Sequence, residues 1–177
     1  MKEKQEALVS IVMGSDSDLP VMKEAAAILT EFEVPHELFL TSAHRSPERT
    51  SLFAGEAAGR GIKVIIVGAG MAAHLAGVIA SQTSLPVIGV PLDSSASSLH
   101  GFDALLSTMQ MPGGVPVATM AIGKAGAKNA ALMAVRILAL DDEGLRRKLD
   151  VYTRKMAENI EKNSRSCDFL PVSRGGR

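Results

Sequence analysis

The sequence predicts an α/β protein built on a doubly wound parallel sheet. Short apolar segments alternate with longer segments whose apolar residues recur at helical spacing, which is typical of parallel strands joined by crossover helices. Some of the short segments are apolar throughout, as strands buried on both faces are. A chain of 177 residues suffices for one such domain with a proper core. We therefore expect a single domain over residues 1–163 and a polar tail over residues 164–177.

Five segments predict strands: four are largely apolar and contain β-branched residues, and residues 36–40 form a short run of strand character. The first ends at Gly14 and the third at Gly68. The third is the most apolar, so we place it at the centre of the sheet. A turn over residues 110–114 is expected to precede the fifth. In chain order the predicted strands span residues 8–13, 36–40, 63–67, 86–90 and 115–122.

Six segments predict helices. Ser17 or Asp18 can cap the first, which has Pro20 in its first turn. Ser46 and Pro47 have the pattern of a cap and a first helical residue for the second. In chain order the predicted helices span about residues 19–32, 46–60, 75–82, 102–109, 126–140 and 143–161.

The last predicted helix, about residues 143–161, is amphipathic. Its apolar stripe is long for a small domain to cover, so it is expected to pack on another subunit. The stripe consists of Leu145, Leu149, Tyr152, Met156 and Ile160.

Composition argues against several classes of protein. The 19 basic and 19 acidic residues balance, and one Tyr with no Trp offers little base stacking, so nucleic acid is not an expected partner. The single cysteine, Cys167, cannot form an internal disulfide. No leader or long apolar span is evident, so we expect a cytoplasmic protein with no membrane contact. The four histidines lack metal-ligand spacing, so no metal site is predicted.

Polar residues follow the first three predicted strands, over residues 15–18, 42–45 and 68–74. In open α/β sheets the loops at the carboxyl ends of the strands bind ligands, so these three loops should form one site. In the first loop, Ser15, Ser17 and Asp18 could be ordinary turn and cap residues. They could equally bind a phosphate, with Asp18 accepting hydrogen bonds from sugar hydroxyls. Both roles can coexist.

The second loop holds the strongest candidates for chemistry. His44 could be an ordinary surface histidine, but Ser42 and Arg45 beside it argue against chance. A guanidinium suits phosphate, and imidazole groups titrate near neutrality and therefore suit proton transfer. His74, near the start of an alanine-rich helix, could be a structural residue.

Three other functions are consistent with this fold class. Residues 68–73 match G-x-G-x-x-A, and Asp93 follows about 20 residues later, so a dinucleotide site is one alternative. That fingerprint normally follows the first strand rather than the third. A receiver-type signalling domain would need an aspartate where the third strand here ends in glycines. A non-catalytic module that binds a nucleotide or a flavin stays open.

Several motifs together carry a resemblance to a known family. The chain is similar to the PurE family, and within it to the class I N5-carboxyaminoimidazole ribonucleotide mutases of purine (IMP) biosynthesis, over roughly residues 9–140. The motifs that carry the resemblance are Gly14-Ser15-Asp16-Ser17-Asp18, Ser42-Ala43-His44-Arg45-Ser46-Pro47, Gly68-Ala69-Gly70, Ala72-Ala73-His74-Leu75 and Gln110-Met111-Pro112-Gly113-Gly114-Val115-Pro116-Val117.

The resemblance implies a three-layer flavodoxin-like fold, strand order 2-1-3-4-5, and a homo-octamer with active sites between subunits. It implies an isomerase without metal or organic cofactor, which moves a carboxylate from the exocyclic nitrogen of a ribonucleotide to ring carbon C4. His44 would be the proton carrier. The positions that match substrate-binding or pocket residues of the family are Ser15, Asp18, Ser42, Arg45, Gly70, Met71, His74 and Leu75.

Two positions beside the expected pocket depart from the family pattern. Met71 stands where the family commonly has a second glycine, and Ala76 stands where it has a proline. Both bear on the choice between the mutase and a class II-like carboxylase, which would use free carbon dioxide and aminoimidazole ribonucleotide. The retained pair His74-Leu75 favours the mutase.

Overall fold

A computed structural model describes residues 6–166. Its centre is a sheet of five parallel strands in the order β2-β1-β3-β4-β5, which confirms the predicted doubly wound flavodoxin-like fold. Of the predicted tail, residues 167–177, which include Cys167, lie outside the described residues. The strands are β1 (Val9–Met13), β2 (His36–Leu40), β3 (Val64–Gly70), β4 (Val87–Leu92) and β5 (Ala118–Thr119).

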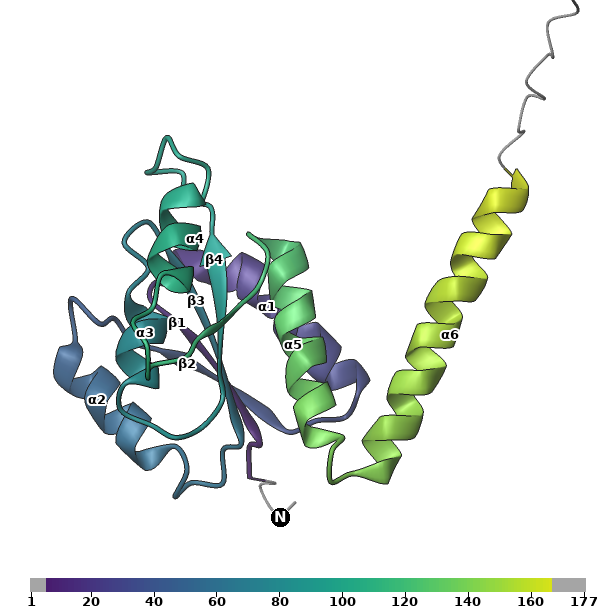
Figure 1. Ribbon diagram of the computed structural model, residues 1–177, viewed down its shortest axis with the longest axis horizontal. Coiled ribbons are helices and arrows are strands. Elements are labelled where there is room, and N and C mark those ends of the chain that lie inside the picture. The colour runs from purple at the N-terminus through teal and green to yellow at the C-terminus, as the bar shows by residue number, and fades with distance from the viewer. Residues whose placement is uncertain (1–5, 167–177) are drawn as a thin grey trace, which may run out of the picture.

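Helices cover both faces of the sheet and make three layers (Figure 1). One core joins α1 and α5 to the sheet through residues such as Ile11, Ile66 and Val90. The other joins α2 and α3 to the opposite face through residues such as Val12, Ile65 and Val67. The helical elements are the short 3-10 helix η1 (Asp16–Asp18), then α1 (Leu19–Glu31), α2 (Pro47–Glu56), α3 (Leu75–Ala80), α4 (Phe102–Met109), α5 (Lys124–Leu138) and α6 (Glu143–Ser166).

The central strand β3 is longer than predicted, and this places three residues of an expected ligand-binding loop in the sheet. Residues 68–70 were expected in a loop, yet they are strand: Gly68 pairs with Met13 and Val90, and Gly70 with Leu92. A Cβ at position 68 would lie 2.4 Å from the Sδ of Met22 on α1, so the absent side chain lets the strand continue beneath that helix. The loop after β3 therefore contains only residues 71–74.

The predicted strand over residues 115–122 is wrong in extent. Only Ala118 and Thr119 pair with β4. Pro116 lacks the N–H group that a sheet ladder needs. The turn expected over residues 110–114 is present, where the Val115 N–H donates to the Pro112 carbonyl at 3.3 Å.

Two predicted helix starts are correct in position but not in their capping bonds. Asp18 directly precedes α1 and Ser46 directly precedes α2, but neither side chain caps its helix. The predicted end of α2 at residue 60 is four residues late. Beyond Glu56 the chain forms turns that close at Gly61, which has a φ of 89° that favours glycine.

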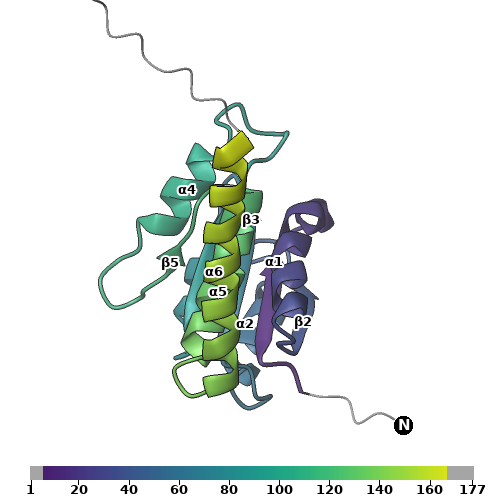
Figure 2. The same cartoon turned by 90° about the vertical axis from the view of Figure 1, so that its right-hand side faces the viewer.

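The last helix, α6, continues to Ser166, beyond the predicted end at residue 161 and into the predicted tail. Leu145, Leu149 and Tyr152 pack against the core, as expected of the apolar stripe. Met156 and Ile160 remain exposed, because α6 points away from the rest of the fold (Figure 1). In the view of Figure 2, α6 and α5 overlap.

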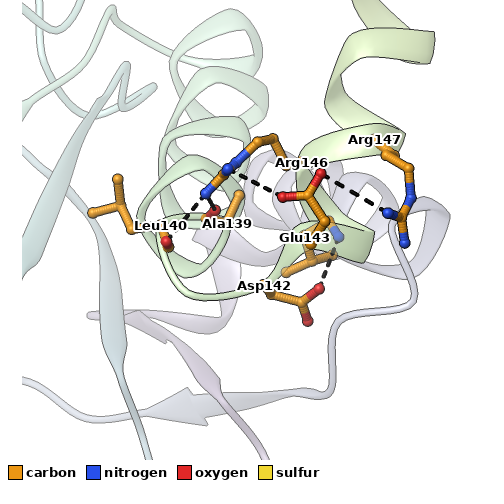
Figure 3. A network of polar contacts seen from close by, with 7 residues as sticks. Ala139, Leu140, Asp142, Glu143, Arg146 and Arg147 are labelled. Carbon is orange, nitrogen blue, oxygen red and sulfur yellow. Dashed lines mark hydrogen bonds and ion pairs between the residues drawn. The ribbon is translucent and has the colours of Figure 1, made fainter.

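Polar contacts hold the base of α6 against the end of α5 (Figure 3). Arg146 donates to the carbonyls of Ala139 and Leu140 at 3.3 and 3.2 Å, and so satisfies carbonyls at the cap of α5 and just beyond it. The same guanidinium pairs with Glu143 at 3.1 Å, and Asp142 accepts from the Leu145 N–H at 2.9 Å. The direction of α6 is therefore set at its first turn. No helix within residues 6–166 is long and apolar enough to span a bilayer.

Candidate functional site

A polar pocket of about 440 Å³ lies at the carboxyl edge of the sheet. The order of the strands reverses beside β1, and ligands of open α/β sheets bind at that point. The structure brings the three predicted loops together there. The pocket is lined by Gly14, Ser15, Ser17, Asp18, Ser42, Ala43, His44, Arg45, Ala69, Gly70, Met71, Ala72, Leu75 and Ser94.

The loop after β1 folds back on itself around Asp18. The Asp18 carboxylate accepts from the Ser15 N–H at 3.0 Å, while the Ser15 hydroxyl accepts from the Ser17 N–H at 3.4 Å. Burial raises the pKa of Asp18, although hydrogen bonds from the Ser15 and Gly14 backbone and the charge of Arg45 oppose that rise. The Asp18 carboxylate keeps acceptor sites for a ligand, whereas Ser15 Oγ accepts from the N–H and the hydroxyl of Ser17 and donates to Asp16.

The loop after β2 rests on a chain of hydroxyl groups beneath it. Ser46 Oγ accepts from the Ser42 N–H at 3.0 Å, which explains why Ser46 does not cap α2. Thr41 Oγ1 lies 3.2 Å from Ser46 Oγ and 2.9 Å from the hydroxyl of Thr50. Thr41 and Thr50 are buried. The hydroxyl chain therefore fixes the backbone that carries His44 and Arg45.

Arg45 bridges the first two loops. Its Nη2 donates to the Gly14 carbonyl at 2.8 Å. Ser42 Oγ accepts from the Arg45 N–H at 3.2 Å. The guanidinium is planar and has five N–H donors, so several stay available for a phosphate at this edge.

His44 lines the pocket and contacts His74, which is 30 positions away in the sequence and does not itself line the pocket. Nε2 of His44 lies 2.9 Å from Nδ1 of His74. Both rings are exposed. His74, which sequence reasoning could not distinguish from a structural histidine, is thus a direct partner of the proposed proton carrier.

The loop after β3 contributes backbone and apolar surface. Gly70 lies close to β4: a Cβ there would be 3.3 Å from both the Leu92 carbonyl oxygen and Ser94 Cβ. Met71 has a φ of 53°, a left-handed conformation that glycine adopts freely. This explains the glycine that the family pattern has at this position. Leu75, the first residue of α3, is buried and forms the floor of this part of the pocket.

Sequence reasoning missed some of the lining. Ser94 comes from the loop after β4, and its only sequence signal was the serine-rich composition of residues 94–98. The lining also includes three alanines, whose methyl side chains give no indication of a site in the sequence: Ala43, Ala69 and Ala72. Ala76, the second departure from the family pattern, is buried in the core with Leu75 and does not line the pocket. Among residues 6–166 no group of three or more His, Cys, Asp or Glu side chains could hold a metal ion.

The pocket combines the guanidinium of Arg45, the carboxylate of Asp18 and the imidazole of His44, which is hydrogen-bonded to His74 beside the pocket. This combination defines an α/β protein with a small-molecule pocket whose side chains suit anion binding and proton transfer. A model of the AIR carboxylase family matches residues 8–159. The chain belongs to this family, and the PurE resemblance of its motifs is confirmed.

Relatives and a solved structure agree with this assignment. The chain is 56% identical over 168 residues to the N5-carboxyaminoimidazole ribonucleotide mutase of Pyrococcus horikoshii, covering 95% of this chain and 93% of that enzyme. It is 53% identical to the phosphoribosylaminoimidazole carboxylase of Saccharomyces cerevisiae, covering 86% of this chain but 26% of that longer protein. The crystal structure of Treponema denticola PurE superposes with a TM-score of 0.82 at 28% identity, covering 92% of this chain and 99% of that one.

Proposed function

We propose that this protein is an N5-carboxyaminoimidazole ribonucleotide mutase. It would move the carboxylate from the exocyclic nitrogen of its substrate to C4 of the imidazole ring, giving 4-carboxy-5-aminoimidazole ribonucleotide. The observation that carries the proposal is the convergence of His44, Arg45 and Asp18 on one pocket. High identity to a mutase along nearly its whole length supports the choice of reaction.

Substrate binding is assigned to the first two loops. Arg45 would bind the single phosphate, because a guanidinium offers paired donors to phosphate oxygens. Asp18 would bind the ribose, since its carboxylate keeps acceptor sites free for sugar hydroxyls, and Ser15 would hold that carboxylate in place through its N–H. Gly70 lies beside the pocket without a side chain, so ligand atoms can approach its backbone.

His44 would carry one proton through the reaction. It donates that proton to the exocyclic nitrogen as the bond from nitrogen to the carboxyl carbon breaks and carbon dioxide forms. A new bond then joins C4 to that carbon, and His44 removes the proton from C4. One imidazole therefore acts first as acid and then as base, and the enzyme ends in its starting state.

Retention of carbon dioxide is the second requirement of the reaction. Between the two bond changes the fragments must stay together, so the pocket has to exclude water and hold them close. His44, Arg45 and Met71 are exposed in the single chain. Cover from a neighbouring subunit would close the pocket, which fits the homo-octamer that the family resemblance implies.

We place the assembly in the cytoplasm as a homo-octamer. Exposed apolar residues on two helices support self-association, because an apolar patch of this kind is uncommon on a monomer. They are Met156 and Ile160 on α6, and Phe102, Leu106 and Met109 on one face of α4.

The proposed reaction can be tested with purified protein. N5-carboxyaminoimidazole ribonucleotide should give the C4 carboxylate in buffer free of bicarbonate, ATP and added metal. His44→Asn should abolish turnover while substrate still binds. Carboxylation of aminoimidazole ribonucleotide only at high bicarbonate, without conversion of the carbamate, would favour the carboxylase instead. A purified protein that carries a flavin would favour the non-catalytic module.

A further inference from the structure

The contact between the two histidines constrains where their protons lie. Nε2 of His44 and Nδ1 of His74 are 2.9 Å apart, and the rings meet edge to face at 85°. A hydrogen bond at this distance needs a proton on one nitrogen and a lone pair on the other. Two N–H groups would repel, and two lone pairs would not bond. The pair therefore shares one proton at this contact.

We propose that His74 is a positioning residue that fixes the tautomer of His44. In this assignment His74 carries its own proton on Nε2 and offers the lone pair of Nδ1 to the Nε2–H of His44. The nitrogen of His44 that remains free is Nδ1, and it exchanges the proton with the substrate. The kinetic consequence rests on the proposed mutase function, whereas the tautomer is a property of the free protein.

Only this direction of the hydrogen bond suits a group that is first acid and then base. If His74 donated instead, neutral His44 would carry its proton on Nδ1 and have no free lone pair there for the C4 proton. In the proposed direction Nε2–H donates to His74 whether Nδ1 of His44 is protonated or not. The hydrogen bond thus survives both steps without rearrangement, as the orienting partner of a catalytic base requires.

Burial and hydrogen bonds hold the backbone at both His44 and His74 in place. Ala73 and Leu75, on either side of His74, are 1% and 3% exposed, and the His74 carbonyl accepts from the Val78 N–H of α3 at 2.9 Å. The turn that carries His44 is closed by the Ser46 N–H, which donates to the Ser42 carbonyl at 2.9 Å. The pair is therefore formed before substrate arrives.

No other side chain in the described pocket takes the orienting role. The charged groups that line it are Asp18 and Arg45. Asp18 accepts from Ser15, and Arg45 donates to Gly14. Within residues 6–166 neither forms a hydrogen bond or ion pair with an imidazole of the pair, so His74 alone is placed to hold His44.

Two substitutions of His74 separate positioning from a merely structural role. His74→Asn keeps an acceptor, because the side-chain oxygen of asparagine lies near the place of Nδ1. His74→Leu removes it at an exposed position where a change of side chain should not prevent folding. We expect the leucine variant to lose about tenfold to a hundredfold in kcat with little change in KM, and asparagine to restore most of kcat.

The tautomer itself can be read by NMR of protein labelled with 15N-histidine, without any turnover. Neutral His44 should carry its proton on Nε2 in the wild type and in His74→Asn, and should mix both tautomers in His74→Leu. A proton on Nδ1 in the wild type, or an unchanged tautomer in His74→Leu, would overturn the assignment. Should the NMR agree while the wild type converts no substrate, the hydrogen-bond assignment stands and the mutase function fails.

Discussion

Arg45 Nη2 donates to the main-chain carbonyl of Gly14 at 2.8 Å and ties the loop after β2 to the loop after β1. The same side chain has to hold a phosphate in the proposed complex. A guanidinium can make both contacts because its donors lie in a fork, whereas the ammonium group of lysine acts as a single charge.

Arg45→Lys should therefore weaken binding of the ribonucleotide by about tenfold or more, which corresponds to the loss of one hydrogen bond to a charged group. We expect kcat to change less than KM, since His44 is held by its hydrogen bond with His74 and not by Arg45. Arg60→Lys is the matched control: Arg60 pairs with Glu37 and does not line the pocket. Equal affinity of Arg45→Lys and the wild type, measured by calorimetry, would remove Arg45 from the phosphate site.

Asp18 predicts a dependence of stability on pH. Burial raises its pKa in the folded protein, so the folded state holds this proton more tightly than the unfolded chain does. Ionisation of Asp18 thus costs stability as the pH rises through and above the ordinary range of an aspartate. Asp18→Asn should unfold at an equal or higher temperature than the wild type at pH 7, and bind substrate about tenfold more weakly. The difference in stability should shrink as the pH falls below that range.

Asp103 provides a control of opposite sign. A hydrogen bond from the Ser97 hydroxyl, and then one from the Ala104 N–H, lower its pKa, so its contribution to stability is lost as the pH falls. Asp103→Asn should lower the unfolding temperature at pH 7 and have less effect in acid. If both variants shift stability in the same direction at pH 7, the argument from burial of Asp18 is wrong.

Met71 predicts a strained turn at the mouth of the pocket. A non-glycine residue at a φ of 53° costs about 1–2 kcal/mol. Met71→Gly should relieve that strain, and Met71→Ala should remove the side chain but keep the strain. The glycine variant should exceed the alanine variant by about 1 kcal/mol in the free energy of unfolding, measured in urea. Equal stability of the two variants would mean that the turn carries no strain.

The exposed end of α6 predicts a role in assembly. Met156→Ser with Ile160→Ser changes the apolar stripe beyond the part that packs on the core, so the single chain should still fold. Analytical ultracentrifugation should find the wild type as an octamer and the variant as smaller species. Arg154→Ser with Glu158→Ser, on another face of the helix, should leave the octamer intact. An octameric stripe variant would place the interface elsewhere.

Much of the fold was predictable because its signals are local. The runs Val9–Met13 and Val64–Val67 are largely apolar and buried on both faces, and loop chemistry such as Ser46-Pro47 marks a helix start without any tertiary information. The extension of β3 through Gly68 was not predictable, because it depends on Met22 packing over that position. The shortness of β5 was not predictable either, because it depends on which residues pair with β4, and only Ala118 and Thr119 do.

The site, like the fold, has some residues that local sequence patterns reveal and others that depend on tertiary contacts. Ser15, Asp18, Ser42, His44 and Arg45 stand out in the sequence because polar and ionisable residues follow buried strands. The pairing of His44 with His74 joins residues from different loops, and Ser94 reaches the pocket from a fourth loop. Such contacts arise only when the sheet brings the strand ends together, so residue type alone could not reveal them.

The fate of the carboxylate carbon tests the proposed mutase most directly. The substrate would be labelled with 13C in its carbamate group and converted in buffer that contains unlabelled bicarbonate, with early product examined by 13C NMR. A pocket that retains carbon dioxide predicts that the label appears undiluted in the C4 carboxylate. A label diluted toward the composition of the bulk bicarbonate would contradict the mutase and point to carboxylation from free carbon dioxide.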